Sequence, residues 1–413
     1  MHTAVIGAGI GGLALAAGLR RKGFDVTVFE RDVDVAATGG YHITLDGRAQ
    51  AALRNLIAPA DFERLLASAS ALRLRRPDAW WDRRGRLLGH GPDLGADDGV
   101  DIDRITLRTV LASAVGADLR LGCSLDQVTH AGDRSPVAVF ADGSTHRCDL
   151  LVGADGSHSV VARQLAGGAT NAPAGIIGFS GRTRRADLDA GEQRRLGLRS
   201  GMAIGPRGSA LYVGFLDPIG NAVLDATELR ASVTTGPTYI WGAMFPETPS
   251  TDALRGLSGA ELQAALIARF GGHGWGGRPL EVIARADPGS VAAFRFNAAS
   301  TRAADLAPWP AGRVTALGDA VHATPPTAGM GAGAAIRDAE SLVGYLSEAA
   351  AGRLAPRVAI GRFEAEMRVR GSEVLTQSMR TVRWILATDT RLGAPLTVAV
   401  TGMLAAANRL GRR

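Results

Sequence analysis

A cluster of glycines near residue 10 constrains the fold of this chain more than any other feature. Gly7, Gly9 and Gly12 satisfy the pattern G-x-G-x-x-G between an expected strand, His2–Ile6, and an expected helix, Ile10–Arg21. In such a unit the glycines allow a tight turn, close approach of a pyrophosphate and close packing of helix on strand. The helix N-terminus offers unpaired N–H groups to the phosphates. The pattern therefore predicts a Rossmann-like dinucleotide-binding unit.

A carboxylate supports this prediction. Glu30 ends the second expected strand, Asp25–Glu30, where its side chain can accept hydrogen bonds from a ribose 2′-hydroxyl and disfavours a 2′-phosphate. A second copy of the glycine pattern, residues 272–277, follows an expected helix and runs into Pro279, so we interpret it as a loop. We therefore expect the dinucleotide at the first copy, and a bound nucleotide other than NADP.

The basic charge balance raises the question of a nucleic-acid partner. The 413 residues carry a net charge of +6, yet Lys22 is the sole lysine and the arginines are scattered along the chain. A nucleic-acid site would need a clustered basic stripe and a recognisable module, and the sequence shows neither. The 46% apolar content excludes a disordered chain, and the 54 glycines lack the period of collagen.

The cysteines and the ends of the chain favour a cytoplasmic protein. Cys123 and Cys148 have neither metal-ligand spacing nor a C-x-x-C pattern, which is typical of reduced thiols. Met1 runs directly into an apolar strand, without the charged region of a signal peptide. The uncharged stretch Leu392–Asn408 approaches the length of a membrane span, but it contains glycine and proline. We therefore expect a packed C-terminal helix and no transmembrane segment, with the oligomeric state, monomer or dimer, left open.

The order of the expected elements predicts an α/β fold. Strand, helix and strand open the chain, strand-like runs dominate the middle, and helices follow the late strand near residue 315. The economical arrangement is a Rossmann-like domain with an inserted, mostly antiparallel β-sheet domain and a C-terminal helical segment. We expect the first domain to comprise residues 1–71, 100–170 and 297–350, the inserted domain 72–99 and 171–296, and the C-terminal helices 351–413.

Two further motifs place an aspartate at the end of a strand. Asp155 and Gly156 follow the expected buried strand 149–152, and Asp319 follows the expected strand 313–317. A proline and glycine loop, residues 325–331, then leads from Asp319 into a long helix. Taken singly, each motif has an ordinary explanation, because Asp and Gly are common turn residues and Asp319 could cap a helix.

The three motifs in this order resemble those of the flavoprotein hydroxylases of the para-hydroxybenzoate hydroxylase type, the class A FAD-dependent monooxygenases. The resemblance extends from Gly7 to Asp338. It implies that Asp319 binds the ribityl or phosphate region of FAD. It also implies that Arg104, the arginine of an Arg-x-x-Leu motif, contacts FAD; without the resemblance, Arg104 would be interpreted as an ordinary surface arginine. The cofactor-binding residues it implies are Gly7, Gly9, Gly12, Glu30, Arg31, Arg104, Asp155, Gly156, Asp319, Pro326, Gly329 and Gly331.

The resemblance also implies a reaction. NADH or NADPH visits as a transient co-substrate and reduces FAD, and a flavin C4a-hydroperoxide then hydroxylates an apolar aromatic or polyketide-like molecule, as in secondary metabolism. A helix starting near Gly331 would favour the anionic reduced flavin, and Pro325 and Pro326 would wall the place where oxygen adds. A FAD-dependent dehydrogenase or reductase, Baeyer–Villiger insertion and a non-catalytic nucleotide-binding protein remain alternatives. A halogenase is disfavoured, because the sole lysine lies on the first expected helix.

The chain departs from the family pattern at two positions. Gly333 stands where the family often has asparagine, and His42 stands where many relatives have an arginine near the active site. His42 is thus a candidate for the catalytic region with Pro325 and Pro326, although a neutral histidine hydrogen-bonded to a backbone carbonyl is the simpler reading. No side chain stands out as a general base. Aromatic and sulfur-containing side chains of the inserted sheet are candidate substrate contacts or ordinary sheet core: Trp80, Tyr212, Phe215, Trp241, Met244, Phe294 and Phe296.

Overall fold

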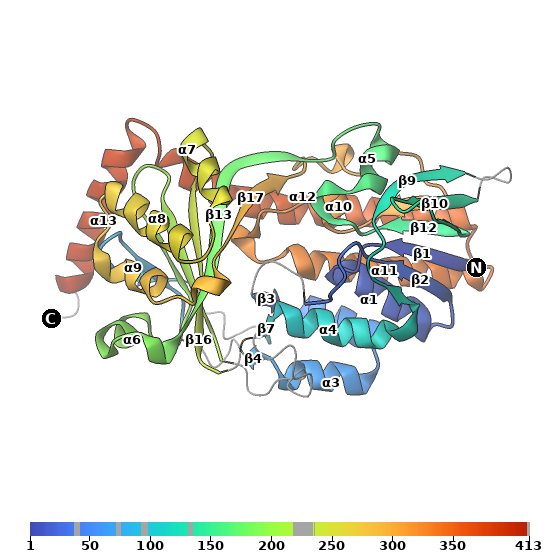
Figure 1. Ribbon diagram of the computed structural model, residues 1–413, viewed down its shortest axis with the longest axis horizontal. Coiled ribbons are helices and arrows are strands. Elements are labelled where there is room, and N and C mark those ends of the chain that lie inside the picture. Colours follow the sequence, from blue (N-terminus) through green and yellow to red (C-terminus); the bar gives the residue numbers. More distant parts are fainter. Residues whose placement is uncertain are drawn as a thin grey trace.

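Two large sheets dominate the fold (Figure 1). The computed structural model describes residues 1–36, 42–71, 76–91, 98–130, 135–217, 234 and 236–410, so residues 72–75 and 92–97 of the predicted inserted segment 72–99 lie outside the described residues. A parallel sheet with its helices lies on the right of Figure 1, and a mostly antiparallel sheet on the left. The predicted α/β fold with an inserted sheet and C-terminal helices is confirmed.

The parallel sheet has five strands in the order β18-β12-β1-β2-β8. Its central strands are buried along nearly their whole length, which suits a sheet covered on both faces. One face packs on α1, α2, α4 and α11, and the other on α5 and a three-stranded sheet in the order β11-β10-β9. The bounds are β1 (His2–Ile6), α1 (Ile10–Arg21), β2 (Asp25–Phe29), α2 (Gly47–Leu56), α4 (Arg104–Val115), β8 (Leu119–Arg120), β9 (Leu125–His130), β10 (Pro136–Phe140), β11 (Thr145–Arg147), β12 (Leu150–Gly153), α5 (Val160–Ala166), β18 (Val314–Ala316), α10 (Asp319–His322) and α11 (Gly331–Ala350).

A small antiparallel sheet lies between the two large ones (Figure 1). Its order is β3-β7-β4, with β3 (His42–Leu45), β4 (Ser70–Ala71) and β7 (Val100–Asp103), and α3 (Pro59–Ala67) precedes β4. Strand β7 leads directly into α4, whose first residue is Arg104. The Asp103 carboxylate caps α4 by accepting hydrogen bonds from the backbone N–H groups of Ile105 and Thr106. The cap fixes where α4 starts and thereby positions Arg104.

The seven-stranded sheet has two faces of different character. Its order is β17-β13-β16-β15-β14-β5-β6, so β5 and β6 join strands that follow them by about a hundred residues. The outer face packs on α6, α8 and α9, and the inner face turns toward the Rossmann-like domain (Figure 1). The bounds are β5 (Ala79–Trp81), β6 (Leu87–His90), β13 (Ala172–Arg184), α6 (Ala190–Leu196), β14 (Gly201–Ile204), β15 (Ala210–Leu216), β16 (Thr238–Pro246), α7 (Pro249–Asp252), α8 (Gly259–Gly272), α9 (Gly277–Ala284) and β17 (Ala292–Ala298).

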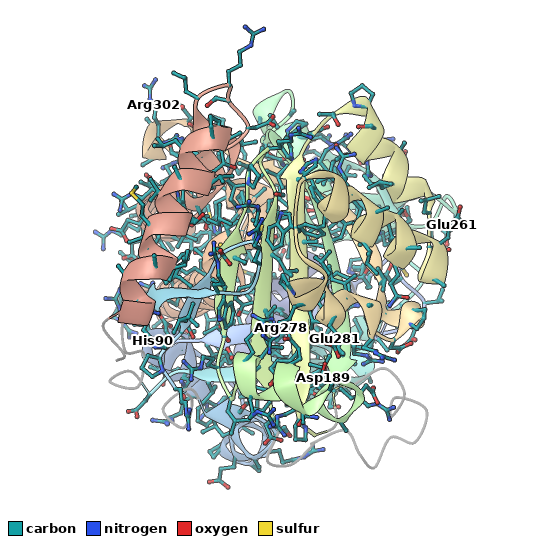
Figure 2. All side chains as sticks on the ribbon, turned by 90° about the vertical axis from the view of Figure 1, so that its left-hand side faces the viewer. His90, Asp189, Glu261, Arg278, Glu281 and Arg302 are labelled. Atoms are coloured by element: carbon teal, nitrogen blue, oxygen red, sulfur yellow. The ribbon has the colours of Figure 1, made fainter. Side chains whose placement is uncertain are left out.

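The last two helices join the domains and flank the sheet. Helix α12 (Pro356–Ala387) contributes Phe363 and Leu375 to the core beneath the parallel sheet and Ile385 to the core on the inner face. Helix α13 (Gly393–Leu410) lies along the edge strand β6. Figure 2 shows α13 on one side of the sheet and α8 and α9 on the other. No helix within the described ranges is both long and apolar enough to cross a membrane.

The predicted packing of the C-terminal helix is only half right. One side of α13 meets β6, where the Asn408 side chain donates to the Leu87 carbonyl at 3.1 Å. Elsewhere on α13, Leu396 and Met403 are exposed by 62% and 65%. The packed helix that the uncharged sequence predicts therefore keeps part of its apolar surface exposed to solvent.

Candidate active site

Of the three motif glycines in the first loop, only one has room for a side chain. A Cβ atom added at Gly7 would lie 2.4 Å from the Ala154 carbonyl oxygen, and one added at Gly12 would lie 2.1 Å from the Gly7 carbonyl oxygen. At Gly9 the nearest atom would be 3.9 Å away. Gly7 and Gly12 are therefore required by the packing of the protein itself. Gly9 leaves the space through which a phosphate can approach the backbone.

The Glu30 carboxylate stabilises this loop by accepting backbone hydrogen bonds. Its Oε2 accepts a hydrogen bond from the Ala8 N–H at 2.7 Å, and its Oε1 accepts one from the Asp32 N–H at 3.0 Å. The neighbouring Arg31 is exposed and lies 3.9 Å from the Asp32 carboxylate. Glu30 is thus fixed at the end of β2 beside the loop, at the edge of the sheet where a ribose would lie.

Arg108 is the loop's second support, and sequence reasoning missed it. Its Nε donates to the Ala8 carbonyl at 2.9 Å, its Nη1 donates to the Val35 carbonyl at 2.9 Å, and its Nη2 lies 3.3 Å from Glu30 Oε2. The side chain is buried. The available signal was helical spacing, because Arg108 follows Arg104 by one turn and residues at that separation share a helix face.

Asp155 and Gly156 lie directly beside the glycine loop. The Asp155 Oδ2 accepts a hydrogen bond from the Val160 N–H at 2.7 Å, and its Oδ1 accepts one from the Ser159 hydroxyl. Burial raises the pKa of Asp155, although these hydrogen bonds lower it. Gly156 has a φ of +74° and open space where a Cβ would stand. The carboxylate organises the start of α5, while Gly156 leaves backbone accessible.

Asp319 and Arg104 come together from distant parts of the chain. Asp319 starts α10 and its Oδ1 would be 3.8 Å from a Cβ at Gly331, where α11 begins. Burial raises the pKa of Asp319, while the charges of His322 and Arg104 pull it down. Burial likewise lowers the pKa of Arg104, and Asp319 opposes this. Solvent still reaches Asp319, so a carboxylate surrounded by protein remains open to a ligand.

A buried ion cluster supports the turn that carries Asp319. His322 Nε2 lies 2.6 Å from Asp338 Oδ2, and Arg370 Nε donates to Asp338 Oδ1 at 2.7 Å. Asp338 Oδ2 also accepts a hydrogen bond from the Gly318 N–H at 3.1 Å. Burial raises the pKa of Asp338, but His322 and Arg370 outweigh it and hold that pKa below its ordinary value. The cluster fixes the turn at Gly318 in place.

The proline loop runs past the small central sheet. Pro325 is buried and Pro326 is exposed, and a short 3-10 turn, Pro326–Ala328, ends at Gly329 with a φ of +65°. A Cβ at Gly329 would lie 3.8 Å from Thr44 Oγ1. Thr44 in turn donates to Asp101 Oδ1 at 2.7 Å. The loop therefore lies against β3, and α11 starts at Gly331 as predicted.

Strand β3 also meets the inner face of the large sheet. The rings of His42 and Tyr212 are nearly parallel, with 6.1 Å between their centroids. His42 and Thr44 alternate with buried residues along β3 and point to the same side. The prolines, β3 and the inner face thus converge at one junction between the domains.

The predicted substrate contacts divide between the two faces of the large sheet. Trp80, Tyr212 and Phe294 lie partly exposed on the inner face, while Met244 and Phe296 are buried in the core on that face. Phe215 and Trp241 belong instead to the closed core on the outer face. Side chains alternate along a strand, so Phe215 points away from Tyr212 and Trp241 away from Met244. Those two side chains therefore belong to the sheet core, the other reading that the sequence left open.

Comparisons with known proteins agree with this geometry. The family described as FAD binding domain matches residues 279–378, and the one described as NAD(P)-binding Rossmann-like domain matches residues 5–61. Among solved structures, a putative FAD-containing monooxygenase from Photorhabdus luminescens has a TM-score of 0.77 at 24% identity, covering 94% of this chain and 98% of that one. Klebsiella pneumoniae HpxO in complex with FAD and uric acid has a TM-score of 0.75 at 21% identity, covering 98% and 93%.

Curated relatives are similar in sequence along most of the chain. The dual O-methyltransferase/FAD-dependent monooxygenase CTB3 of Cercospora beticola is 27% identical over 91% of this chain and 45% of its own length. The chloroplastic zeaxanthin epoxidase of Spinacia oleracea is 28% identical over 84% of this chain and 47% of its own length. The chain thus spans about half the length of these relatives.

Fold and motifs together define a Rossmann-like flavoprotein with an inserted sheet domain. The chain is similar to FAD-binding monooxygenases of the para-hydroxybenzoate hydroxylase type, and the cofactor that the matching segments indicate is FAD. The residues present fit that cofactor. Helices α1 and α11 begin without a side-chain cap, which leaves their N–H groups for phosphate and flavin. Gly9 and Gly156 provide space beside them.

Proposed function

We propose that the protein is an FAD-dependent monooxygenase that uses NADH or NADPH and O2 to hydroxylate an apolar aromatic or polyketide-like small molecule. The balanced reaction converts a substrate C–H bond, O2, NAD(P)H and a proton into a C–OH bond, NAD(P)+ and water. The proposal rests on one arrangement of residues. Gly9 leaves open space at the nucleotide loop, the charges of Arg104 and Asp319 interact with each other, and the rings of His42 and Tyr212 stack at the junction of the two domains. When bound, FAD supplies hydride acceptance and oxygen transfer.

The residues around the glycine loop bind and orient the cofactor in this proposal. Glu30 and Arg108 fix the loop, Gly9 lets the pyrophosphate reach backbone N–H groups, and Asp319 and Arg104 meet the central part of the cofactor. The positive end of α11 stabilises negative charge on the ring. These interactions are set before the reaction begins, because the cluster around Asp338 holds the Gly318 turn rigidly.

The substrate lies, in this proposal, between β3 and the inner face of the large sheet. Trp80, Tyr212 and Phe294 offer partly exposed aromatic surface there, which excludes water from the reacting atoms. His42 and Tyr212 add an imidazole and a phenol that can hydrogen-bond a substrate hydroxyl. Pro325 and Pro326, in the loop against Thr44, form the wall opposite. A phenolic ring would thus be oriented by polar groups at one end and held by apolar ones elsewhere.

The proposed compartment is the cytoplasm. Cys123 and Cys148 are free thiols, and burial raises the pKa of Cys148 to about 11. A thiol with so high a pKa stays protonated and unreactive, which is typical of a buried structural cysteine in a reducing environment.

Oxygen-isotope labelling tests the proposed reaction. The purified protein should retain FAD, and a screen of phenols and polycyclic polyketides should find compounds that stimulate both NAD(P)H oxidation and O2 consumption. Under 18O2 the product should gain one labelled oxygen atom. Reduction of the substrate without O2 consumption would identify a reductase instead, and a ring-expanded product seen by NMR would identify Baeyer–Villiger insertion. Protein that retains NAD and no flavin would contradict the proposal outright.

A further inference from the structure

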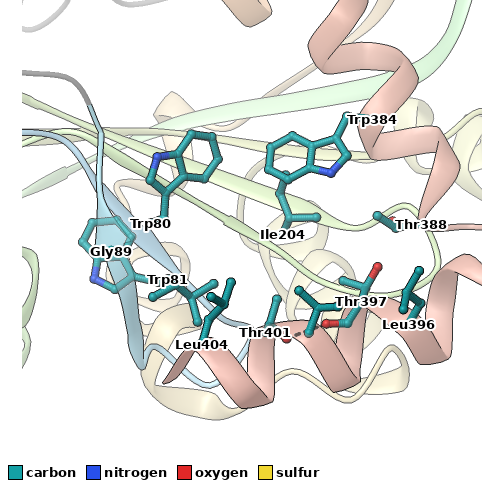
Figure 3. Close-up of a pocket in the computed structure, with 12 residues that line it drawn as sticks. Trp80, Trp81, Gly89, Ile204, Trp384, Thr388, Leu396, Thr397, Thr401 and Leu404 are labelled. Carbon is teal, nitrogen blue, oxygen red and sulfur yellow. Dashed lines mark hydrogen bonds between the residues drawn. The ribbon is translucent and has the colours of Figure 1, made fainter. Parts of the chain in front are cut away.

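An apolar cavity of about 410 Å³ shares Trp80 with the proposed substrate region, but none of the other residues assigned to that region line it. It lies between the β5–β6 edge of the large sheet and the helices α12 and α13 (Figure 3). Its lining includes Trp80, Ile204, Trp384, Leu396, Val400 and Leu404. The volume is within the range of ligand pockets, and none of the described residues that line it carries a charge.

The threonine hydroxyls in the lining are already hydrogen-bonded. The hydroxyls of Thr397 and Thr401 donate to carbonyls of their own helix, those of Gly393 and Thr397, at 2.7 and 2.6 Å. The Thr388 hydroxyl donates to the Ile385 carbonyl at 2.8 Å. The hydroxyl hydrogens are therefore committed to backbone. The cavity offers a ligand mainly apolar surface, so the matching ligand chemistry is hydrocarbon or aromatic.

Large apolar side chains around the cavity remain accessible to water. Trp384 is 48% exposed and its ring lies 5.4 Å from that of Trp80, tilted by 59°. Leu396 and Leu404 face the cavity from α13 (Figure 3) while remaining exposed. Contiguous exposed apolar surface around a cavity is characteristic of a binding site.

One wall of the cavity, Trp80, lies on the same face of the large sheet as Tyr212. Trp80 pairs in register with Met202, and Met202 pairs with Tyr212 on the next strand. All three side chains pack in the same cluster on the inner face. Two strand spacings, about 10 Å, thus separate the cavity wall from the tyrosine that stacks on His42.

We propose that this cavity binds the apolar end of the substrate, so that the enzyme acts on elongated, uncharged, hydrocarbon-rich aromatic molecules. The reacting ring lies at His42 and Tyr212, the body of the molecule crosses Met202, and the distal end enters between Trp80 and Trp384. The inference rests on the proposed function for the position of the reacting ring. The cavity's affinity for apolar ligands is measurable without turnover.

A series of phenols with one unbranched alkyl substituent of increasing length tests the proposal. Binding to the flavin-loaded protein is measured by titration calorimetry, and kcat/KM by NAD(P)H oxidation. Once the chain is long enough to reach Trp80, affinity should rise about three- to fourfold for each added methylene until the cavity is filled. Affinity that does not depend on chain length would overturn the proposal.

Two substitutions on α13 provide the matched comparison. Val400→Trp fills the cavity, whereas Ala406→Trp adds the same side chain at an exposed position on the side of the helix away from the cavity-lining residues. The ratio of long-chain to short-chain affinity should fall toward one in V400W and stay unchanged in A406W. If V400W fails to fold, Thr397→Trp fills the same cavity from the same helix. Equal ratios in the cavity-filling and control variants would overturn the proposal.

The outcomes separate this inference from the proposed function. Length-dependent binding that V400W removes, without turnover of any phenol, would support the cavity and contradict the monooxygenase proposal. Turnover that is independent of chain length would do the reverse. If the wild-type protein instead binds neutral phosphatidylcholine vesicles or dimerises, and V400W abolishes that association but not the length dependence, the cavity belongs to a membrane or a second copy and the proposal fails.

Discussion

The Nε2 atom of His322 lies 2.6 Å from Oδ2 of Asp338, and both side chains are completely buried. The same carboxylate oxygen accepts the Gly318 N–H, one residue before Asp319. A charge pair with no contact to the proposed substrate region therefore determines where Asp319 points. Such a pair is strongly destabilising to break, because one charge is left buried and uncompensated.

Replacing His322 should give a pH-dependent loss of stability. Burial disfavours the imidazolium, but Asp338 and Asp319 outweigh it and raise the pKa of His322 above its ordinary value. A raised pKa stabilises the fold fully below about pH 6.5, and this stabilisation is lost as pH rises through the folded-state pKa. His322→Gln should therefore cost about 3–5 kcal/mol near pH 6 and less at pH 9, measured by urea unfolding. The exposed His130→Gln is the control; a cost for H322Q that is constant with pH would contradict this assignment.

The glycine loop should distinguish folding from cofactor binding. Gly12→Ala places a Cβ 2.1 Å from the Gly7 carbonyl oxygen, so we expect a large fall in Tm or insoluble protein. Gly9→Ala meets no atom closer than 3.9 Å, so the apoprotein should keep its Tm while FAD affinity falls at least about tenfold, because the pyrophosphate loses its approach. Gly277→Ala in the second glycine pattern has open space and should change neither. Equal FAD affinity in G9A and wild type would argue against a cofactor phosphate at this loop.

Arg108 should contribute to stability and to FAD binding, although no sequence motif marks it as functional. Arg108→Met removes the donors to Ala8 and Val35 and leaves Glu30 without its buried cation. We expect about 3–5 kcal/mol of destabilisation in the free energy of unfolding together with weaker FAD binding. Arg20→Met breaks the exposed pair with Asp118 and should cost about 0–1 kcal/mol. Similar losses in the two variants would contradict the role of Arg108 as a support of the glycine loop.

Arg104 and Asp319 should act on FAD as a coupled pair. Each single substitution, Arg104→Gln or Asp319→Asn, should weaken FAD binding about tenfold or more, because each removes a charge that also positions the other. The double variant should lose less than the sum of the two free-energy changes, since residues in one charge network are not additive. Fluorescence titration of FAD into the apoprotein measures all four corners of the cycle. Strict additivity would mean that the two side chains act separately.

Substitutions on the two faces of the large sheet should have different effects, on activity for the inner face and on stability for the outer face. Tyr212→Ala on the inner face should lower kcat/KM for the aromatic substrate with little change in Tm, since its ring is partly exposed beside His42. Trp241→Ala on the outer face should cost about 3–5 kcal/mol of stability because the side chain fills a closed core. Circular dichroism and NAD(P)H oxidation follow the two effects. A greater change of substrate specificity in W241A than in Y212A would contradict the division of the faces.

The sequence predicts this fold well where function depends on neighbouring residues. The glycine loop, Asp155-Gly156 and the run from Asp319 to Gly331 each lie within about a dozen residues, so a single segment carries both the chemistry and the turn that presents it. The same holds for the start of α4 at Arg104, which Asp103 caps locally.

The features that could not be predicted from the sequence depend on contacts between residues that are far apart in the chain. Arg108 reaches Ala8 across a hundred residues, and Arg370 reaches Asp338 from the next helix. The face of the sheet on which Phe215 and Trp241 lie could not be predicted for a different reason. Alternation predicts that Tyr212 and Phe215 point to opposite faces, but not which face is covered by α8 and α9.

The position of α12 limits how the molecule can open. Its 32 residues form a continuous rod about 48 Å long, anchored in one core by Phe363 and in the other by Ile385. A hinge between the two domains would have to break this rod or pull one end out of its core. The two halves should therefore move as a single body, and passage of a nicotinamide or a substrate to the interior falls to side chains, loops and the cofactor itself.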